Sequence, residues 1–239
     1  LDVDTRHGAI TNLRTFGNEL IFWQENALGK FAVNDRAIIT DNNNLPLALG
    51  TSGVLSRYDY VATVNGMKNG HNDSDCQSDN VLYWFDYDRN ELCAYSGGSV
   101  VCISKAKYVQ TYLNNLALDK SEQIGKPICT FDKYYNEMIA TLSNSESIVY
   151  NENLQMFTSF YSLVPEFNVY FNSDVYFTKG DDLYKYNDNV VNNGFSDAPL
   201  PIMLKYIVNK DFLRTKVFDN IEFVGYLNKD NIRISYTAD

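Results

Sequence analysis

The chain has few of the residues on which most enzyme sites depend. Its 239 residues include two histidines, two tryptophans, four cysteines and nine glutamates. A Ser-His-Asp or Cys-His arrangement would have to use His7 or His71, and both lie in polar, loop-like stretches that favour solvated side chains. No G-x-S-x-G motif surrounds any serine, and no glycine-rich phosphate loop is present. The sequence therefore predicts a protein that is not an enzyme, with no catalytic or cofactor-binding residues.

Positive charge is also scarce. Twenty Lys and Arg residues stand against 30 Asp and Glu, which gives a net charge of −10. Because no Lys/Arg cluster interrupts this excess, specific nucleic-acid binding and binding to an anionic membrane surface are not expected. There is no run of 18 apolar residues, so no membrane span is expected. No basic–apolar leader is visible and residue 1 is Leu, so we expect a fragment of a longer chain.

Asparagine, aspartate and aromatic residues are abundant instead. The 28 Asn and 21 Asp residues together make 49, and 18 Tyr and 14 Phe residues accompany them. Asn and Asp favour tight turns, whereas Tyr and Phe favour pleated, half-buried strands. The composition therefore predicts an all-β protein of short strands, with most of the acidic charge at turns.

The clearest local pattern is a β-meander between residues 81 and 104. It predicts strands at 81–87, 91–95 and 100–104, separated by Asp88-Arg89-Asn90 and by Ser96-Gly97-Gly98. Further strands are expected in three other units: three strands within 18–40 with turns at 25–29 and 34–35; strands at 128–131, 137–142, 147–150 and 155–161; and strands at 169–171, 175–178 and 183–186.

These repeated meanders predict propeller-like blades, with a multi-sheet β-sandwich as the alternative. The meander domain would span residues 1–194, with an inserted loop at 66–80 and one short helix at 105–118. Residues 195–239 would form a C-terminal β extension, with strands at 202–208 and 221–227.

No C-x-x-C pair occurs among the four cysteines, which are Cys76, Cys93, Cys102 and Cys129. A zinc site made of cysteines alone is therefore not expected. We expect free thiols, three of them on strands and Cys76 in a loop. Cys93 and Cys102 flank a Gly-Gly hairpin, so they could face each other across it.

One turn has the spacing of a calcium loop. Asp86, Asp88 and Asn90 follow the D-x-D-x-N pattern, in which alternate oxygens can point at one cation. Glu91 stands where the sharp turn of that loop requires Gly, which favours an ordinary β-turn closed by Asx hydrogen bonds. The metal interpretation is therefore the weaker of the two.

Several passages resemble a known family. They are residues 51–66 (TSGVLSRYDYVATVNG), 83–98 (YWFDYDRNELCAYSGG), 216–223 (KVFDNIEF) and much of 126–187, including PICTFDKYYNEMIATL and DDLYKYN. These passages cover about two thirds of the chain and are similar to the stabilization or muzzle proteins in the tails of crAss-like bacteriophages. The shared motifs are structural and carry no catalytic residues.

The resemblance implies a structural protein of the virion, made in the host cytoplasm and placed at the distal end of the tail. It implies a homo-oligomeric ring in contact with other tail proteins, which helps to retain or gate the ejected cargo. Two alternatives stay open at this point. One is a propeller-type module that binds glycan or protein on an aromatic face, and the other is a glycoside hydrolase with two hidden carboxylates.

Overall fold

The computed structural model describes residues 2–33, 37–40, 46–49, 55–119, 122–171, 174–186, 194–195 and 198–199. The chain divides into two compact units, 1–199 and 200–239, and every described residue belongs to the first. The strands expected at 202–208 and 221–227 lie outside the described residues.

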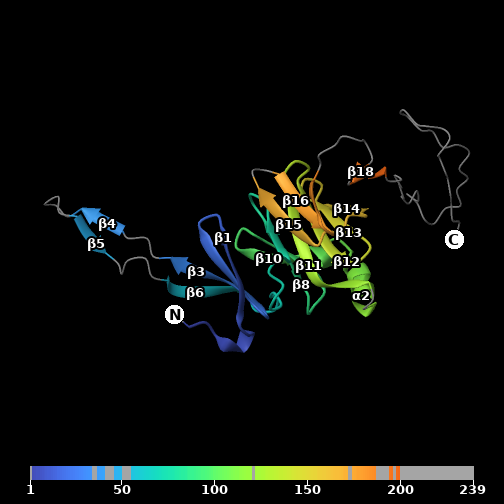
Figure 1. Cartoon of the computed structure of the whole chain (residues 1–239). Coiled ribbons are helices and arrows are strands. Elements are labelled where there is room, and N and C mark those ends of the chain that lie inside the picture. The colour runs from blue at the N-terminus through green and yellow to red at the C-terminus, as the bar shows by residue number, and fades with distance from the viewer. Residues whose placement is uncertain are drawn as a thin grey trace, which may run out of the picture. The chain divides into compact units, whose positions relative to one another are not determined.

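Four antiparallel sheets follow one another along the chain (Figure 1). We name them sheets I to IV. Sheet I contains β1 (Ile10–Phe16), β2 (Glu19–Gln24), β3 (Ala27–Val33) and β6 (Leu55–Ala62); sheet II contains β7 (Asp75–Gln77), β8 (Leu82–Asp86), β9 (Glu91–Ser96) and β10 (Ser99–Cys102); sheet III contains β11 (Gln123–Asp132), β12 (Glu137–Ser143), β13 (Ser147–Asn151) and β14 (Met156–Tyr161); sheet IV contains β15 (Phe167–Phe171), β16 (Asp174–Lys179) and β17 (Asp182–Lys185). In every sheet each strand pairs with the next described strand of that sheet, so the first strand is always an edge strand.

The remaining elements are short. β4 (Ala37–Thr40) pairs with β5 (Pro46–Leu49), and β18 (Gly194–Phe195) pairs with β19 (Ala198–Pro199). A 3-10 turn, η1 (Thr5–His7), precedes β1, and two helices, α1 (Ile103–Ala106) and α2 (Gln110–Leu118), connect sheet II to sheet III. No helix among the described residues is long and apolar enough to cross a membrane.

Residues with positive φ angles close the tight turns. Asn90 and Asn136 have φ angles of 54° and 55° in the β8–β9 and β11–β12 turns. Gly97 and Gly98, at 58° and 83°, reverse the chain between β9 and β10. Asn and Gly tolerate this left-handed region better than other residues, which explains why they occupy these four turn positions.

The sheets stack through both faces of their strands. Successive residues of a strand point to opposite faces, so Trp84 and Cys93 face sheet I whereas Tyr83 and Leu92 face sheet III. Three apolar layers result, and each joins two consecutive sheets: Ile21, Trp23, Leu28, Leu82, Trp84, Cys93 and Tyr95 between I and II; Tyr83, Phe85, Leu92, Phe131, Met138, Ala140, Ile148 and Tyr150 between II and III; Ile139, Val149, Val175 and Phe177 between III and IV. A sheet buried on both faces needs continuous apolar strands, which explains the run from Leu82 to Phe85.

Four expectations about local structure were wrong. The region 66–80 is not only a loop, because it contains β7. The helix expected at 105–118 is two helices, because Tyr108 takes a φ of 62° between α1 and α2. The strand expected at 100–104 ends at Cys102, where α1 begins, and the turn expected at 25–29 is confined to Glu25 and Asn26.

The all-β prediction is confirmed, but a closed propeller is not. The described residues form several stacked sheets with no closed barrel, which fits the multi-sheet alternative. The helix α2 packs against the layer between sheets II and III through Leu113, and it lies beside the strands of sheet III in Figure 1.

Candidate functional site

The first strands of all four sheets meet at one cavity of about 300 Å³. Its wall includes Arg14 from β1, Asp75–Gln77 from β7, Ile128–Phe131 from β11, and Asn168 and Tyr170 from β15. Because each of these strands is the first edge of its sheet, the cavity runs along the side of the stack where the four sheets begin. We call it the first-strand cavity.

Polar contacts connect these first strands in series. Arg14 forms an ion pair with Asp75, and Asn12 Nδ2 donates a hydrogen bond to the same carboxylate at 3.0 Å. The amide of Cys129 donates to the Asp73 carbonyl, just before β7, at 2.8 Å. Asn168 donates to the Thr130 hydroxyl. Sheet I is thus connected to II, II to III, and III to IV at the cavity.

Asp75 is the buried charge of this series. Its side chain is fully shielded from solvent, whereas Arg14 is partly exposed. Burial raises the pKa of Asp75 to about 6, and the opposing effects of Arg14 and of the Asn12 hydrogen bond only partly offset it. Above that pH the carboxylate and the guanidinium form an ion pair between sheets I and II.

This pKa shift makes a pH-dependent contribution to stability. Between about pH 4 and pH 6 the folded protein binds more protons at Asp75 than the unfolded chain does, so this contribution falls as the pH rises through that window. A difference of about two pKa units corresponds to about 3 kcal/mol. We expect the free energy of unfolding of the wild type, relative to Asp75→Asn, to decrease by up to that amount from pH 4 to pH 7.

Chemical denaturation of both proteins across this pH range measures the effect. The comparison with Asp75→Asn is needed because burial also raises the pKa of Asp86 to about 6, and both proteins retain that second group. A difference that does not change with pH would contradict the assignment to Asp75.

A second ion pair lies at the cavity. Lys133 contacts Asp79 at 2.8 Å, and its ammonium group lies 5.8 Å from the centre of the Tyr170 ring. Both residues of the ion pair are exposed, so this pair contributes little to stability. Together with Arg14 and Asp75, these contacts place carboxylates beside cations at the cavity.

The calcium-loop residues lie where β8 turns into β9: Asp86 ends β8, and Asp88 and Asn90 lie in the turn. Asp86 is buried, and its two oxygens accept hydrogen bonds from the amides of Gly66 at 3.1 Å and Arg89 at 3.2 Å. Asp88 lies 3.9 Å from Lys68, and Asn90 takes the left-handed conformation. These contacts are those of a turn closed by an Asx hydrogen bond, which was the favoured interpretation, and cation binding at Asp86, Asp88 and Asn90 stays the weaker, untested alternative.

All four cysteines are free thiols. Cys93 and Cys102 do face each other across the β9–β10 hairpin, as the spacing suggested. Cys76 lies on β7, so its expected loop position was wrong. Burial raises the pKa of the Cys76 and Cys129 thiols, which keeps both protonated and unreactive.

The two histidines differ from each other. His7 lies in η1 and packs against the ring of Tyr60. His71 is buried rather than solvated, so that part of the prediction was wrong. Burial lowers the pKa of His71, and its ring contacts that of Tyr87 with 4.7 Å between the centroids.

The contact between Arg14 and Asp75 was not found from the sequence. Its two residues lie in β1 and β7, and neither strand was predicted. A signal for β1 exists, because Asn12 and Arg14 alternate with Thr11, Leu13 and Thr15, which gives one face of the strand two large polar residues. The three-residue strand β7 is too short to show a period.

Comparison with known proteins shows that this chain is similar to phage proteins. A family model described as Crassvirus muzzle protein matches residues 1–189, which include all four sheets. A curated relative, the muzzle protein of Bacteroides phage crAss001, is 26% identical over 245 residues. The alignment covers 100% of this chain and 17% of the relative, so the chain spans about a sixth of that protein's length.

Proposed function

The chain belongs to the crassvirus muzzle protein family, and from this premise we propose that it is a structural protein of a phage virion. The relative of known name is a muzzle protein, which supports a role in the tail, at the end from which cargo leaves. The stack of four sheets joined through apolar layers suits a scaffold, because its stability is distributed over the whole unit.

We further propose that the four sheets are consecutive blades of a propeller-type arrangement. In a propeller the blades follow one another along the chain and are arranged around a central channel. The first-strand cavity supports this geometry, since β1, β7, β11 and β15 all contribute to its wall. It is the observation on which the proposed architecture depends.

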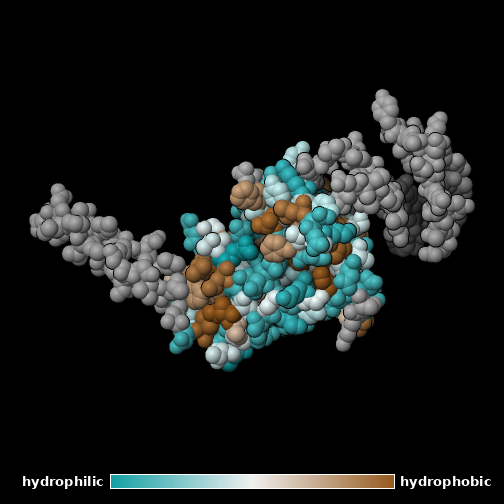
Figure 2. Space-filling model, in the orientation of Figure 1, coloured by the Kyte–Doolittle hydropathy of each residue, from teal (hydrophilic) through white to brown (hydrophobic). Residues whose placement is uncertain are grey.

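The outward faces of the end sheets support further assembly. On sheet IV, one face carries Phe167, Val169, Phe171 and Leu183, and the last two are 69% and 66% exposed. On sheet I, the face opposite sheet II carries Leu13 beside the packed rings of Phe22, Phe31, Tyr58 and Tyr60. Figure 2 shows brown, apolar surface beside sheet I and over sheet IV.

Because the two faces differ, a contact between them on neighbouring copies is heterologous. Repeated heterologous contacts form a ring when the rotation between copies closes. We therefore propose a homo-oligomeric ring that contacts other tail proteins and helps to retain or gate the ejected cargo. The net charge of −10 disfavours binding to DNA that passes through such a ring.

Charge placed on the exposed face of sheet IV tests this proposal. We expect the purified protein to form rings in electron micrographs, and the double variant Phe171→Lys/Leu183→Lys to need at least about tenfold more protein to associate, since each lysine must be desolvated in the contact. Light scattering across a concentration series measures the association. Leu118→Lys on α2 is the control, because Leu118 is 82% exposed and lies outside this face. A strictly monomeric protein at high concentration, or equal loss of association in the control, would overturn the proposal.

A further inference from the structure

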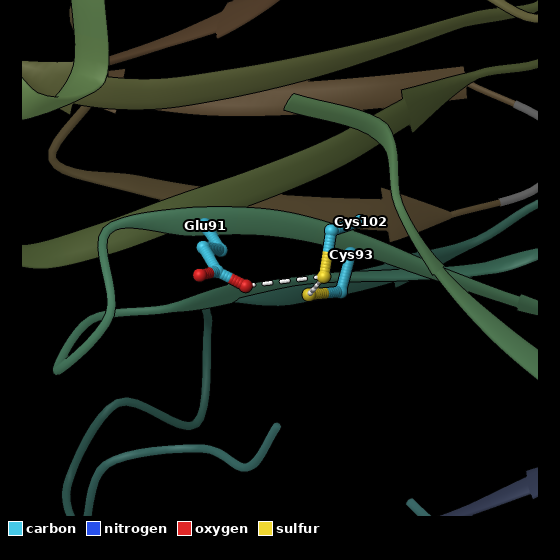
Figure 3. Close-up of side chains that lie close together, drawn as sticks. All are labelled: Glu91, Cys93 and Cys102. Atoms are coloured by element: carbon cyan, nitrogen blue, oxygen red, sulfur yellow. Dashed lines mark hydrogen bonds between the residues drawn. The ribbon is translucent and has the colours of Figure 1, made fainter. Parts of the chain in front are cut away.

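Three side chains that can bind a metal converge between sheets I and II. Glu91 begins β9, Cys93 follows two residues later on the same face, and Cys102 at the end of β10 is the direct cross-strand partner of Cys93. The thiol sulfurs lie 3.5 Å apart, and Cys102 Sγ lies 3.1 Å from Glu91 Oε2 (Figure 3). Their ligand atoms all lie within 4.8 Å of one another.

Two further residues complete the group. Asn65, in the segment after β6, donates through Nδ2 to Glu91 Oε2 at 3.0 Å, and its Oδ1 lies 3.7 Å from Cys102 Sγ. Lys105 binds the other carboxylate oxygen, Oε1, at 2.5 Å. Because Lys105 occupies Oε1, Oε2 is the oxygen that lies beside the Cys102 thiol and the Asn65 amide nitrogen.

We propose that Cys93, Cys102, Glu91 and Asn65 form a binding site for a thiophilic divalent metal ion of the zinc class. Two sulfurs and two oxygens make a four-ligand set, which suits the tetrahedral coordination of Zn²⁺. With Zn–S bonds of about 2.3 Å and Zn–O bonds of about 2.0–2.2 Å, neighbouring ligands of a tetrahedron lie about 3.3–3.8 Å apart. The present distances of 3.5 and 3.1 Å need to change by only a few tenths of an ångström.

The charges also balance. Binding breaks two S–H bonds, forms two metal–sulfur bonds and releases two protons to solvent. Two thiolates and the Glu91 carboxylate then carry three negative charges, against two positive charges on the ion and one on Lys105. The group is therefore neutral overall, so that no buried charge is left unpaired.

The site is open to solvent on one side, and it lies where sheets I and II meet. Cys93 and Glu91 are buried, but Cys102 is partly exposed and Lys105 is more than half exposed. Asn65 belongs to the segment that leaves sheet I, whereas the other three ligands belong to sheet II. A bound ion would therefore join consecutive sheets on the face that carries Trp84.

Titration of the reduced protein with Co²⁺ under anaerobic conditions tests the proposal, because thiolate ligation of Co²⁺ gives a charge-transfer absorption band. We expect one equivalent to bind and Zn²⁺ to displace it. Cys93→Ser and Cys102→Ser should each abolish the band, and Glu91→Gln should weaken binding by about tenfold or more. Cys129→Ala is the matched control, because its buried thiol lies in a different layer, and it should bind Co²⁺ like the wild type.

A measurement on the wild type alone guards against variants that fail to fold. Zn²⁺ should slow the alkylation of Cys93 and Cys102, read by mass spectrometry, at least about tenfold relative to the metal-free protein. Absence of the charge-transfer band, a band retained in both cysteine variants, or equal alkylation with and without Zn²⁺ would overturn the proposal. A Cys93–Cys102 disulfide that forms with a low-molecular-weight disulfide as oxidant, with no metal bound to the reduced protein, would likewise overturn it.

Discussion

Replacing Trp84 with alanine is expected to lower the free energy of unfolding by about 3–5 kcal/mol, the range for removing a buried aromatic side chain. Trp84 is fully buried between sheets I and II, where its ring meets that of Trp23 edge-to-face with 6.0 Å between the centroids. Its indole nitrogen donates to the Gly66 carbonyl at 3.1 Å. The substitution therefore leaves a cavity and an unpaired buried carbonyl group together.

Equilibrium denaturation with an unchanged denaturant slope measures this loss. Tyr108→Ala is the control, because Tyr108 is 94% exposed between α1 and α2. We expect the free energy of unfolding of the control to change by near zero, because alanine at this position carries the same left-handed backbone strain as the tyrosine of the wild type. A loss below about 1 kcal/mol for Trp84→Ala would mean that the layer between sheets I and II is not closely packed.

Replacing Gly66 with alanine is the second large effect. A Cβ atom at this position would lie well inside contact distance of the backbone carbonyl oxygens of Gln24 and Glu25. Backbone cannot move aside as a side chain can, and Gly66 is also held by its hydrogen bonds with Asp86 and Trp84. We therefore expect a loss at the upper end of the range of about 1–3 kcal/mol for overpacking.

Gly125→Ala is the matched control for Gly66→Ala. Gly125 lies in β11, and a Cβ atom there meets nothing within 4 Å. Alanine costs less entropy than glycine on folding, so we expect no loss, or a gain of up to about 1 kcal/mol. Equal losses in the two variants, measured by the same denaturation experiment, would contradict a steric role for Gly66.

The double variant Trp84→Ala/Gly66→Ala should not lose the sum of the two single effects. The two residues share a hydrogen bond and a packing region, and effects at sites in contact are not additive. A smaller combined loss would identify the segment after β6 and strand β8 as one packed unit. This unit joins sheet I to sheet II.

Strand positions were predictable where a strand has at least one buried face and polar turns bound it. The strands β8, β9, β12, β13 and β16 lie within one or two residues of their predicted ranges. Aromatic and β-branched residues between Asn, Asp and Gly turns specify such strands locally. The break between α1 and α2 was not predictable in this way, because a tyrosine rarely adopts the φ of 62° found at Tyr108.

The sites depend on contacts that no local pattern records. Arg14 and Asp75 are 61 positions apart, and they meet only because sheet I stacks on sheet II. The facing of Cys93 and Cys102 was predictable, because a two-residue glycine turn sets the register of their hairpin. Asn65 and Lys105 reach Glu91 from two other segments of the chain, so their contacts with it could be seen only in the structure.

The strict order of the sheets along the chain has a consequence for synthesis on the ribosome. Sheet I is complete by residue 62, sheet II by residue 102, sheet III by residue 161 and sheet IV by residue 185. Among the described strands, no sheet waits for a strand from a later one, so pairing needs only nearby partners, and such local topologies fold quickly. Each sheet that emerges from the ribosome can pack at once against the apolar face of the sheet before it. The described part of the chain can therefore fold progressively from its amino-terminal side, with only one sheet's apolar surface exposed at any time.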